Sequence, residues 1–182
     1  MASNSIHLTD FHEAVKATLE ANVDWLQSVD YYPEVQTQLP APCAFFSVAD
    51  WEFSDRQPMN GQLAVDLNCE LLVVFGIADL AYQLKVRNAA MALCLEVSEN
   101  RWGLPVEGAK LQSAQPDAFS SELDGYAVWN IRWLQSIEVG ADAFDGVGIT
   151  PTQVMVGYSP YIGTGNESMY TEVTDGSPLP GE

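Results

Sequence analysis

Basic residues are scarce in this 182-residue chain, where seven Lys and Arg stand against 25 Asp and Glu and give a formal net charge of −18. A protein that binds duplex DNA through its phosphates needs clustered Lys and Arg, because counterion release drives the affinity. The last basic residue is Arg132. The composition therefore argues against a nucleic-acid-binding surface and indicates an acidic surface that keeps the protein soluble or repels phosphate.

Cysteine and histidine are scarce as well. The three cysteines lie in apolar segments without a CxxC pair: Cys43, Cys69 and Cys94. A zinc site needs several sulfur and nitrogen ligands at close spacing, so we predict reduced thiols that act as small hydrophobic side chains, with no metal and no other cofactor. The only histidines are His7 and His12, and the pair His12 and Glu13 is interpreted as helix capping. With no catalytic constellation, we predict that the protein is not an enzyme.

Long apolar runs are missing too, since no stretch approaches the roughly 18 residues that indicate a membrane span. The first residues, MASNSIHLTDF, have neither the basic region nor the apolar core of a secretion signal. Apolar residues still make up 47% of the chain and charged residues 18%, which is typical of a globular protein. We therefore expect a globular protein that stays where it is made and does not enter a membrane.

Two segments have the apolar periodicity of helices. In residues 9–27 the apolar positions follow one helical face, with Asp10 and Glu13 as a capping box or Thr9 as the cap. In residues 78–100 a second apolar side is predicted, with Lys85, Arg87 and Asn88 facing outward. The residues of that predicted apolar side are Leu80, Ala81, Leu84, Met91, Ala92 and Leu95.

Extended segments alternate with these helices, and a turn at Ser54–Gly61 joins two of them. The predicted strands are 29–36, 43–53, 62–75, 109–115 and 126–139. Pro33 confines the first to an edge or a bulge. Residues 62–75 are apolar on one face throughout and on both faces in their second half, which suggests entry into the helix layer or a neighbouring subunit.

The amino-acid composition changes at Gly140, after which Gly, Asp and Pro become frequent. We predict an α+β core over 1–139, a mostly antiparallel sheet with two helices on one face, and a C-terminal extension over 140–182 whose last residues are disordered. Within the extension, residue types common at interface anchors predict docking on a neighbour or partner: Tyr158, Pro160, Tyr161 and Ile162. The alternative is that Val154–Val156 adds an edge strand to the chain's own sheet, with the tyrosines covering its core.

In the order of its elements and the residue patterns within them, the chain resembles the tail terminator proteins of long-tailed bacteriophages, especially those of contractile-tailed, Mu-like phages. The resemblance spans about residues 8–139 and is carried by LTDFHEAVKATLEA, the YYPE strand, PCAFFSVADWEF, QLAVDLNCELLVVF, AYQLKVRNAAMALCLEV and YAVWNIRWLQSIEV. The segment VGYSPYIGTGNESMY is similar to the Gly-, Tyr- and Pro-containing extension of some Mu-like members.

This resemblance implies a virion protein, assembled in the host cytoplasm, that forms a homo-oligomeric ring, usually a hexamer. Such a ring caps the tail tube, stops its polymerisation and contacts the sheath and the head-completion proteins of the neck. An acidic lumen would let DNA pass without binding. Arg56 and Arg132 are then candidates for ion pairs between subunits.

A second hypothesis from another class is an acidic binding module or inhibitor that masks a basic partner protein. Such a module should gather its carboxylates on one exposed face, whereas the sequence spreads them over segments expected to be loops. The sequence therefore favours the ring-forming protein.

Overall fold

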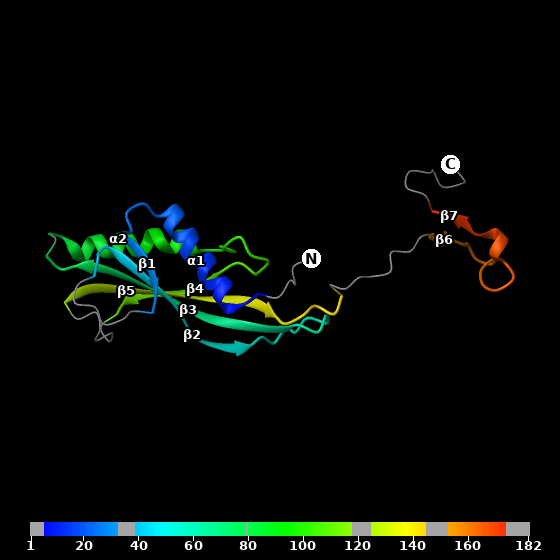
Figure 1. The fold of residues 1–182 in the computed structure, drawn as a ribbon, viewed down its shortest axis with the longest axis horizontal. Helices are drawn as coiled ribbons and strands as arrows, with labels where there is room; N and C mark the ends of the chain where they lie inside the picture. Colours follow the sequence, from blue (N-terminus) through cyan, green and yellow to red (C-terminus); the bar gives the residue numbers. More distant parts are fainter. Residues whose placement is uncertain (1–5, 33–38, 79, 118–124, 145–152, 174–182) are drawn as a thin grey trace. The chain divides into compact units, whose positions relative to one another are not determined.

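The computed structural model describes residues 6–32, 39–78, 80–117, 125–144 and 153–173. The chain divides into two compact units, Met1–Asp145 and Gly146–Glu182. The first unit contains the main sheet and both α-helices (Figure 1). The predicted disorder at the end of the extension falls on residues 174–182, outside the described residues.

The first unit is an α+β structure with a five-stranded sheet. Strand β1 runs parallel to β2, whereas the other neighbours are antiparallel, in the order β1-β2-β3-β5-β4. The elements in chain order are α1 (Leu8–Asn22), β1 (Ser28–Tyr31), β2 (Cys43–Phe53), β3 (Leu63–Gly76), α2 (Tyr82–Val97), β4 (Lys110–Pro116) and β5 (Tyr126–Val139). The predicted fold class and element order are confirmed, including the short strand before β5.

The boundaries of the first two elements differ from the prediction. Helix α1 begins at Leu8, with His7 at the N-cap, and the Asp10 carboxylate accepts a hydrogen bond from the His7 N–H at 3.4 Å. The helix ends at Asn22 because the following residues form turns, although Val23 stays buried. Strand β1 is an edge strand, and residues 33–36 of the predicted longer strand lie outside the described residues.

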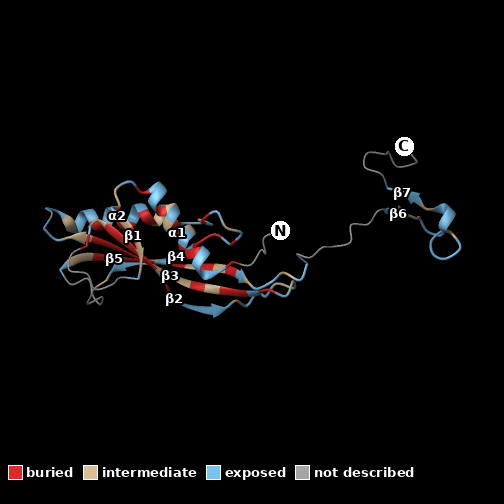
Figure 2. Cartoon of the chain, viewed as in Figure 1, coloured by how far each residue is buried: buried red, intermediate tan, exposed pale blue. Residues whose placement is uncertain are grey.

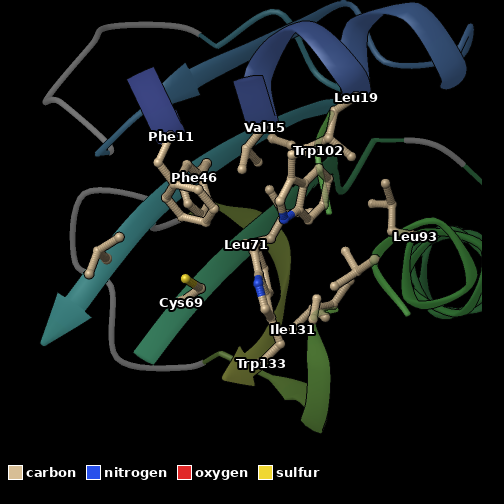
Figure 3. Packing of buried hydrophobic residues seen from close by; sticks show 14 of the residues in the cluster. Phe11, Val15, Leu19, Phe46, Cys69, Leu71, Leu93, Trp102, Ile131 and Trp133 are labelled. Atoms are coloured by element: carbon tan, nitrogen blue, oxygen red, sulfur yellow. The ribbon is translucent and has the colours of Figure 1, made fainter. Parts of the chain in front are cut away.

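The main core lies between the helices and one face of the sheet. Alternate residues of β3, from Val65 to Val73, point into it. Figure 3 shows Phe11 of α1 above Phe46 of β2, and the Phe46 ring stacks on Trp133 of β5 with centroids 5.5 Å apart. Both helices contribute to this one cluster, so they cover the same face of the sheet.

The opposite face of the sheet has a smaller apolar cluster of its own. Its buried members are Leu39, Cys43, Phe45, Leu72, Val74 and Val128. The Leu39 N–H donates a hydrogen bond to the Tyr126 hydroxyl at 3.0 Å, which holds the Leu39 segment against the sheet. The second apolar face of β3 is thus covered by its own chain, and the expectation of a helix layer or a neighbouring subunit there was wrong.

A buried polar link fixes the loop after α2 to the sheet. The Trp102 indole N–H donates to the Gln135 side-chain oxygen at 2.9 Å, and the Gln135 amide donates to the Glu107 carbonyl. Gln135 is fully buried. A buried amide costs stability unless its hydrogen bonds are made, so this link sets the position of the loop on β5.

Candidate functional site

Helix α2 carries its larger apolar side chains on the solvent side. The sheet side of the helix consists of Val86, Ala89, Ala90, Leu93 and Val97. The side predicted to be buried is exposed, so that prediction was wrong, although Lys85, Arg87 and Asn88 are exposed as expected. Three large side chains form an outward stripe, called here the α2 ridge, with exposures of 61, 67 and 75% for Leu84, Met91 and Leu95, and Leu80, which is 90% exposed, lies just before the helix.

The rotation of α2 follows from the size of its inner residues. Ala89 and Ala90 let the helix backbone approach the sheet closely, while Leu93 fills the remaining core space. The Arg87 guanidinium lies over the Trp129 ring of β5, 4.9 Å from its centroid, and adds a contact at the flank of the helix. Close packing by small residues therefore leaves the bulkier leucines and Met91 on the surface.

The sheet also has an apolar surface that neither helix covers. The strands β2, β3 and β5 continue beyond α1 toward the β2–β3 turn (Figure 1), and Figure 2 shows exposed residues at the end of β2. Trp51 and Phe53 are 57% and 70% exposed there. They contribute to a hollow of about 250 Å³, called here the apolar groove, which is lined by Leu8, Trp51, Phe53, Leu63, Val65, Leu67, Ile137 and Val139.

A β-bulge creates this groove. The register of β2 against β3 shifts between Val48 and Asp50, so that Trp51 pairs with Leu67 and Phe53 with Val65. A bulge adds one residue to a strand and therefore moves the following side chains to the other face. Without the bulge, the two aromatic side chains would point away from the helix side, where Leu67 and Val65 lie.

A second hollow, of about 340 Å³, adjoins the groove at Leu8 and also contains the side chains of His12, Glu13, Tyr31 and Tyr32. His12 is buried and packs on Tyr32 with ring centroids 5.8 Å apart. Its Nδ1 donates to the Leu8 carbonyl at 2.8 Å, and its Nε2 lies 3.2 Å from the Tyr32 hydroxyl. The interpretation of His12 and Glu13 as a capping pair was wrong, because His12 belongs to an aromatic cluster.

Carboxylates gather on the sheet face opposite the helices. Register places Asp50 beside Asn68 and Glu52 beside Asp66, and the next strand adds Glu70 with Arg132 and Ala64 with Glu138. Asp50 and Glu52 lie within β2, in the predicted strand 43–53, so the expectation of carboxylates in loops was wrong for these two, whereas Asp55 and Asp117 lie outside the strands. The acidic sheet face consists of Asp50, Glu52, Asp66, Glu70 and Glu138.

The two arginines predicted to pair between subunits occupy different surroundings. Arg132 pairs with Glu70 of the neighbouring strand at 2.8 Å, so it already has a partner within its own chain. Arg56 lines an open cleft of about 580 Å³ together with Arg101, Lys110 and four carboxylates. The Lys110 ammonium lies 2.9 Å from Glu107 and lowers the pKa of that carboxyl group. The mixed charges of this cleft do not favour a ligand of either sign.

The second unit has a small structure of its own. Strand β6 (Met155–Val156) pairs with β7 (Thr171–Glu172), and the 3-10 helix η2 (Glu167–Met169) precedes β7. Tyr170 lies against Gly157, where a Cβ would come within 2.8 Å of its ring, and the Tyr170 hydroxyl accepts a hydrogen bond from the Gly163 N–H at 2.7 Å. Tyr170 thus closes the loop that connects the two strands.

The predicted docking residues lie on that loop. A turn with a Tyr161 N–H to Tyr158 carbonyl hydrogen bond of 2.9 Å contains Pro160, and the side chains of Tyr158, Tyr161 and Ile162 are more than half exposed. Strand β6 pairs with β7 and does not extend the five-stranded sheet, so the alternative of an added edge strand is contradicted. Docking of the exposed residues on a neighbour or partner stays a prediction.

The described residues contain no group of three or more His, Cys, Asp or Glu side chains that could hold a metal ion. Cys43 and Cys69 are buried and Cys94 is partly buried, all as free thiols. Burial raises the pKa of Cys43 to about 11, which makes its thiolate scarce at neutral pH. Within the described part of the chain, no helix is long and apolar enough to cross a membrane.

The α2 ridge and the apolar groove are the surfaces that sequence reasoning missed. Both left a signal. The inner stripe of α2 has a helical spacing as regular as that of the ridge, and the apolar positions of β2 change from even numbers at Phe46 and Val48 to odd numbers at Trp51 and Phe53.

The sequence was compared with known families and proteins. No family model matches the chain, and no curated protein matches it.

Proposed function

We propose that this protein is a ring-forming structural protein of a bacteriophage virion, and in particular a tail terminator of a long-tailed phage. The observation that carries the proposal is that a well-packed core leaves two apolar surfaces open, the α2 ridge and the apolar groove. Large exposed apolar surfaces mark protein interfaces. The order of the elements, which resembles that of tail terminators, directs the proposal from assembly in general to a tail ring.

The charge distribution supports a lumen for DNA. The acidic sheet face presents five carboxylates and the paired Arg132 on strands that are fixed in a sheet, and two of the five, Asp66 and Glu138, also line the open cleft that contains Arg56, Arg101 and Lys110. Fixed negative charge repels phosphates and keeps a passing genome from binding. We assign this face to the lumen, while the exposed Tyr158, Tyr161 and Ile162 of the second unit are assigned to contacts with the tail tube or neck proteins.

The test is electron microscopy of tail tubes assembled from the tube protein of the same genome. With the protein present, tubes should end in a ring at one end and stop growing. Tubes that grow to the same lengths with and without the protein, and that carry no ring, would contradict the proposal. A variant with Asp50, Glu52 and Glu138 changed to their amides should still form the ring but retain DNA in a salt-sensitive way.

The acidic sheet face also favours the second candidate, an acidic module that masks a basic protein. That candidate requires no ring. It predicts a complex with a basic nuclease whose affinity falls steeply with salt, and the same three amide substitutions should abolish it. Binding without any effect on tail tubes would favour the module over the terminator.

A further inference from the structure

The α2 ridge is convex and cannot reach the groove of its own chain. Its helix is held on the sheet by the opposite stripe, of which Leu93 and Val97 are fully buried. The ridge therefore points away from the chain's own sheet, whereas the apolar groove lies on the sheet surface beyond α1. If an α2 ridge fills the groove, that ridge must belong to a second copy of the chain.

The two surfaces are alike in chemistry, since both are apolar. The ridge consists of leucine and methionine side chains, and the groove has aromatic and aliphatic walls. The ridge is flanked by Lys85 and Arg87, two of only seven basic residues in the chain. The groove begins at Leu8, and Glu13 lines the hollow that adjoins it, with Asp10 exposed in the same helix start. The ridge thus has basic residues beside it, and the helix start next to the groove has acidic ones.

We infer that the α2 ridge of one copy docks in the apolar groove of the next copy. The contact uses two different surfaces, so it is heterologous, and repeated heterologous contacts close into a ring when the rotation permits. This inference rests on the proposed function for its ring, and it names the surfaces by which the subunits meet. Opposite charges at the flanks favour this pairing over ridge on ridge or groove on groove.

Disulfide trapping between two single-cysteine surfaces tests the inference. One chain carries Met91→Cys on the ridge, another carries Phe53→Cys in the groove, and both carry Cys94→Ser because Cys94 lies in the same helix. Cys43 and Cys69 are buried and do not compete. Under mild oxidation, a mixture of the two chains should give a crosslinked heterodimer. One chain with both cysteines should give a ladder of multimers.

Matched controls separate docking from random collision. Gln115→Cys replaces the groove cysteine with an exposed position on β4, and Ala17→Cys replaces the ridge cysteine with an exposed position on α1. The ridge–groove product should exceed either control product by about tenfold or more. Because oxidation accumulates even transient contacts, a yield no higher than the controls overturns the inference. Faster self-dimerisation of Met91→Cys alone also overturns it, since it would indicate ridge on ridge.

A charge variant then tests the ridge at a second position, away from the crosslinking cysteine. Leu84→Asp should lower the yield of Phe53→Cys with Met91→Cys by about tenfold or more, the factor expected when burial of a leucine side chain is lost. Ser98→Asp adds the same charge just after α2 and should leave the yield unchanged. Equal yields for the two variants would show that the ridge is not buried in the contact.

Failure of the inference can be distinguished from failure of the proposed function. If rings form on tail tubes but no ridge–groove crosslinks appear, the proposed tail-terminator function stands and the ridge–groove interface is refuted. If the protein gives crosslinked ladders but has no effect on tail tubes, the ridge–groove interface stands and the proposed tail-terminator function is refuted.

Discussion

The two helices cover the same face of the sheet but use their apolar residues differently. Helix α1 buries its largest apolar side chains, with Phe11 and Val15 completely enclosed. Helix α2 buries Ala89 and Ala90 and exposes Leu84 and Met91. The difference shows that an apolar helical stripe in a sequence does not by itself tell whether its side chains face the chain's own core or solvent.

The outer faces of the helices support this distinction. The outer face of α1 carries Lys16, which pairs with Glu20 and with Asp30 of β1. The outer face of α2 has the α2 ridge instead, and an exposed stripe of this kind in a chain with 25 acidic residues is costly to solubility unless another surface covers it.

The largest expected effect on stability would come from removing the buried Phe11 side chain of α1. Phe11→Ala should lower the free energy of unfolding by about 3–5 kcal/mol, because the phenyl ring is fully buried and packs edge-on against Phe46 at 5.8 Å between centroids. Urea denaturation followed by circular dichroism measures the change. The exposed neighbour Glu13→Ala is the control, and an effect of equal size in both variants would contradict the assigned core.

The sharpest test of the comparison lies within α2, where two leucines stand two residues apart. Leu93 is completely buried and Leu95 is 75% exposed. Leu93→Ala should cost about 2–5 kcal/mol, whereas Leu95→Ala should change stability by no more than about 0.5 kcal/mol. Denaturation at low protein concentration keeps subunit contacts from contributing. If Leu95→Ala is the more damaging, the helix is rotated as its larger side chains suggest.

Much of this fold could be predicted because strand patterns have a period of two that survives tertiary packing. The alternation in 62–75 predicted β3 and its faces, and 126–139 matched β5 to the residue. Pro33 correctly placed the preceding strand at an edge. These patterns are local, and the buried face of a central strand has no alternative orientation once the sheet forms.

The features that could not be predicted depend on neighbours far away in the sequence. Two stripes of α2 compete, and only the close approach to β5 selects the smaller one. The burial of His12 depends on Tyr32, which lies 20 residues away, and the apolar groove depends on a bulge after Val48. The α2 ridge and the apolar groove therefore required the structure, and the assembly function stays a prediction.

A smaller effect is expected at the buried link beside α2. Gln135→Leu would leave the Trp102 indole N–H and the Glu107 carbonyl without their partner, which should cost about 1–3 kcal/mol. Gln115→Leu on the exposed strand β4 serves as the control. Tryptophan fluorescence during urea denaturation measures both. A neutral Gln135→Leu would mean that the loop is not held by this link.

The smallest effect concerns the charged outer face of α1. Partial burial alone would lower the pKa of Lys16, but its hydrogen bond to Asp30 at 3.3 Å and the charges of Asp30 and Glu20 raise it above the ordinary value of 10.5. A lysine whose pKa is higher in the folded chain than in the unfolded chain stabilises the fold fully at pH values below the unfolded-state pKa. This stabilisation is lost as the pH rises through the folded-state pKa. Lys16→Met should therefore cost less than about 1 kcal/mol at pH 7, and the cost should shrink as the pH rises through the raised pKa of Lys16. Thermal denaturation at pH 7, 9 and 11 measures it, with Lys85→Met on α2 as the matched variant. A cost that stays constant with pH would show that Lys16 acts through packing of its alkyl chain, and the two outer faces would then differ less in their electrostatics than the ion pairs indicate.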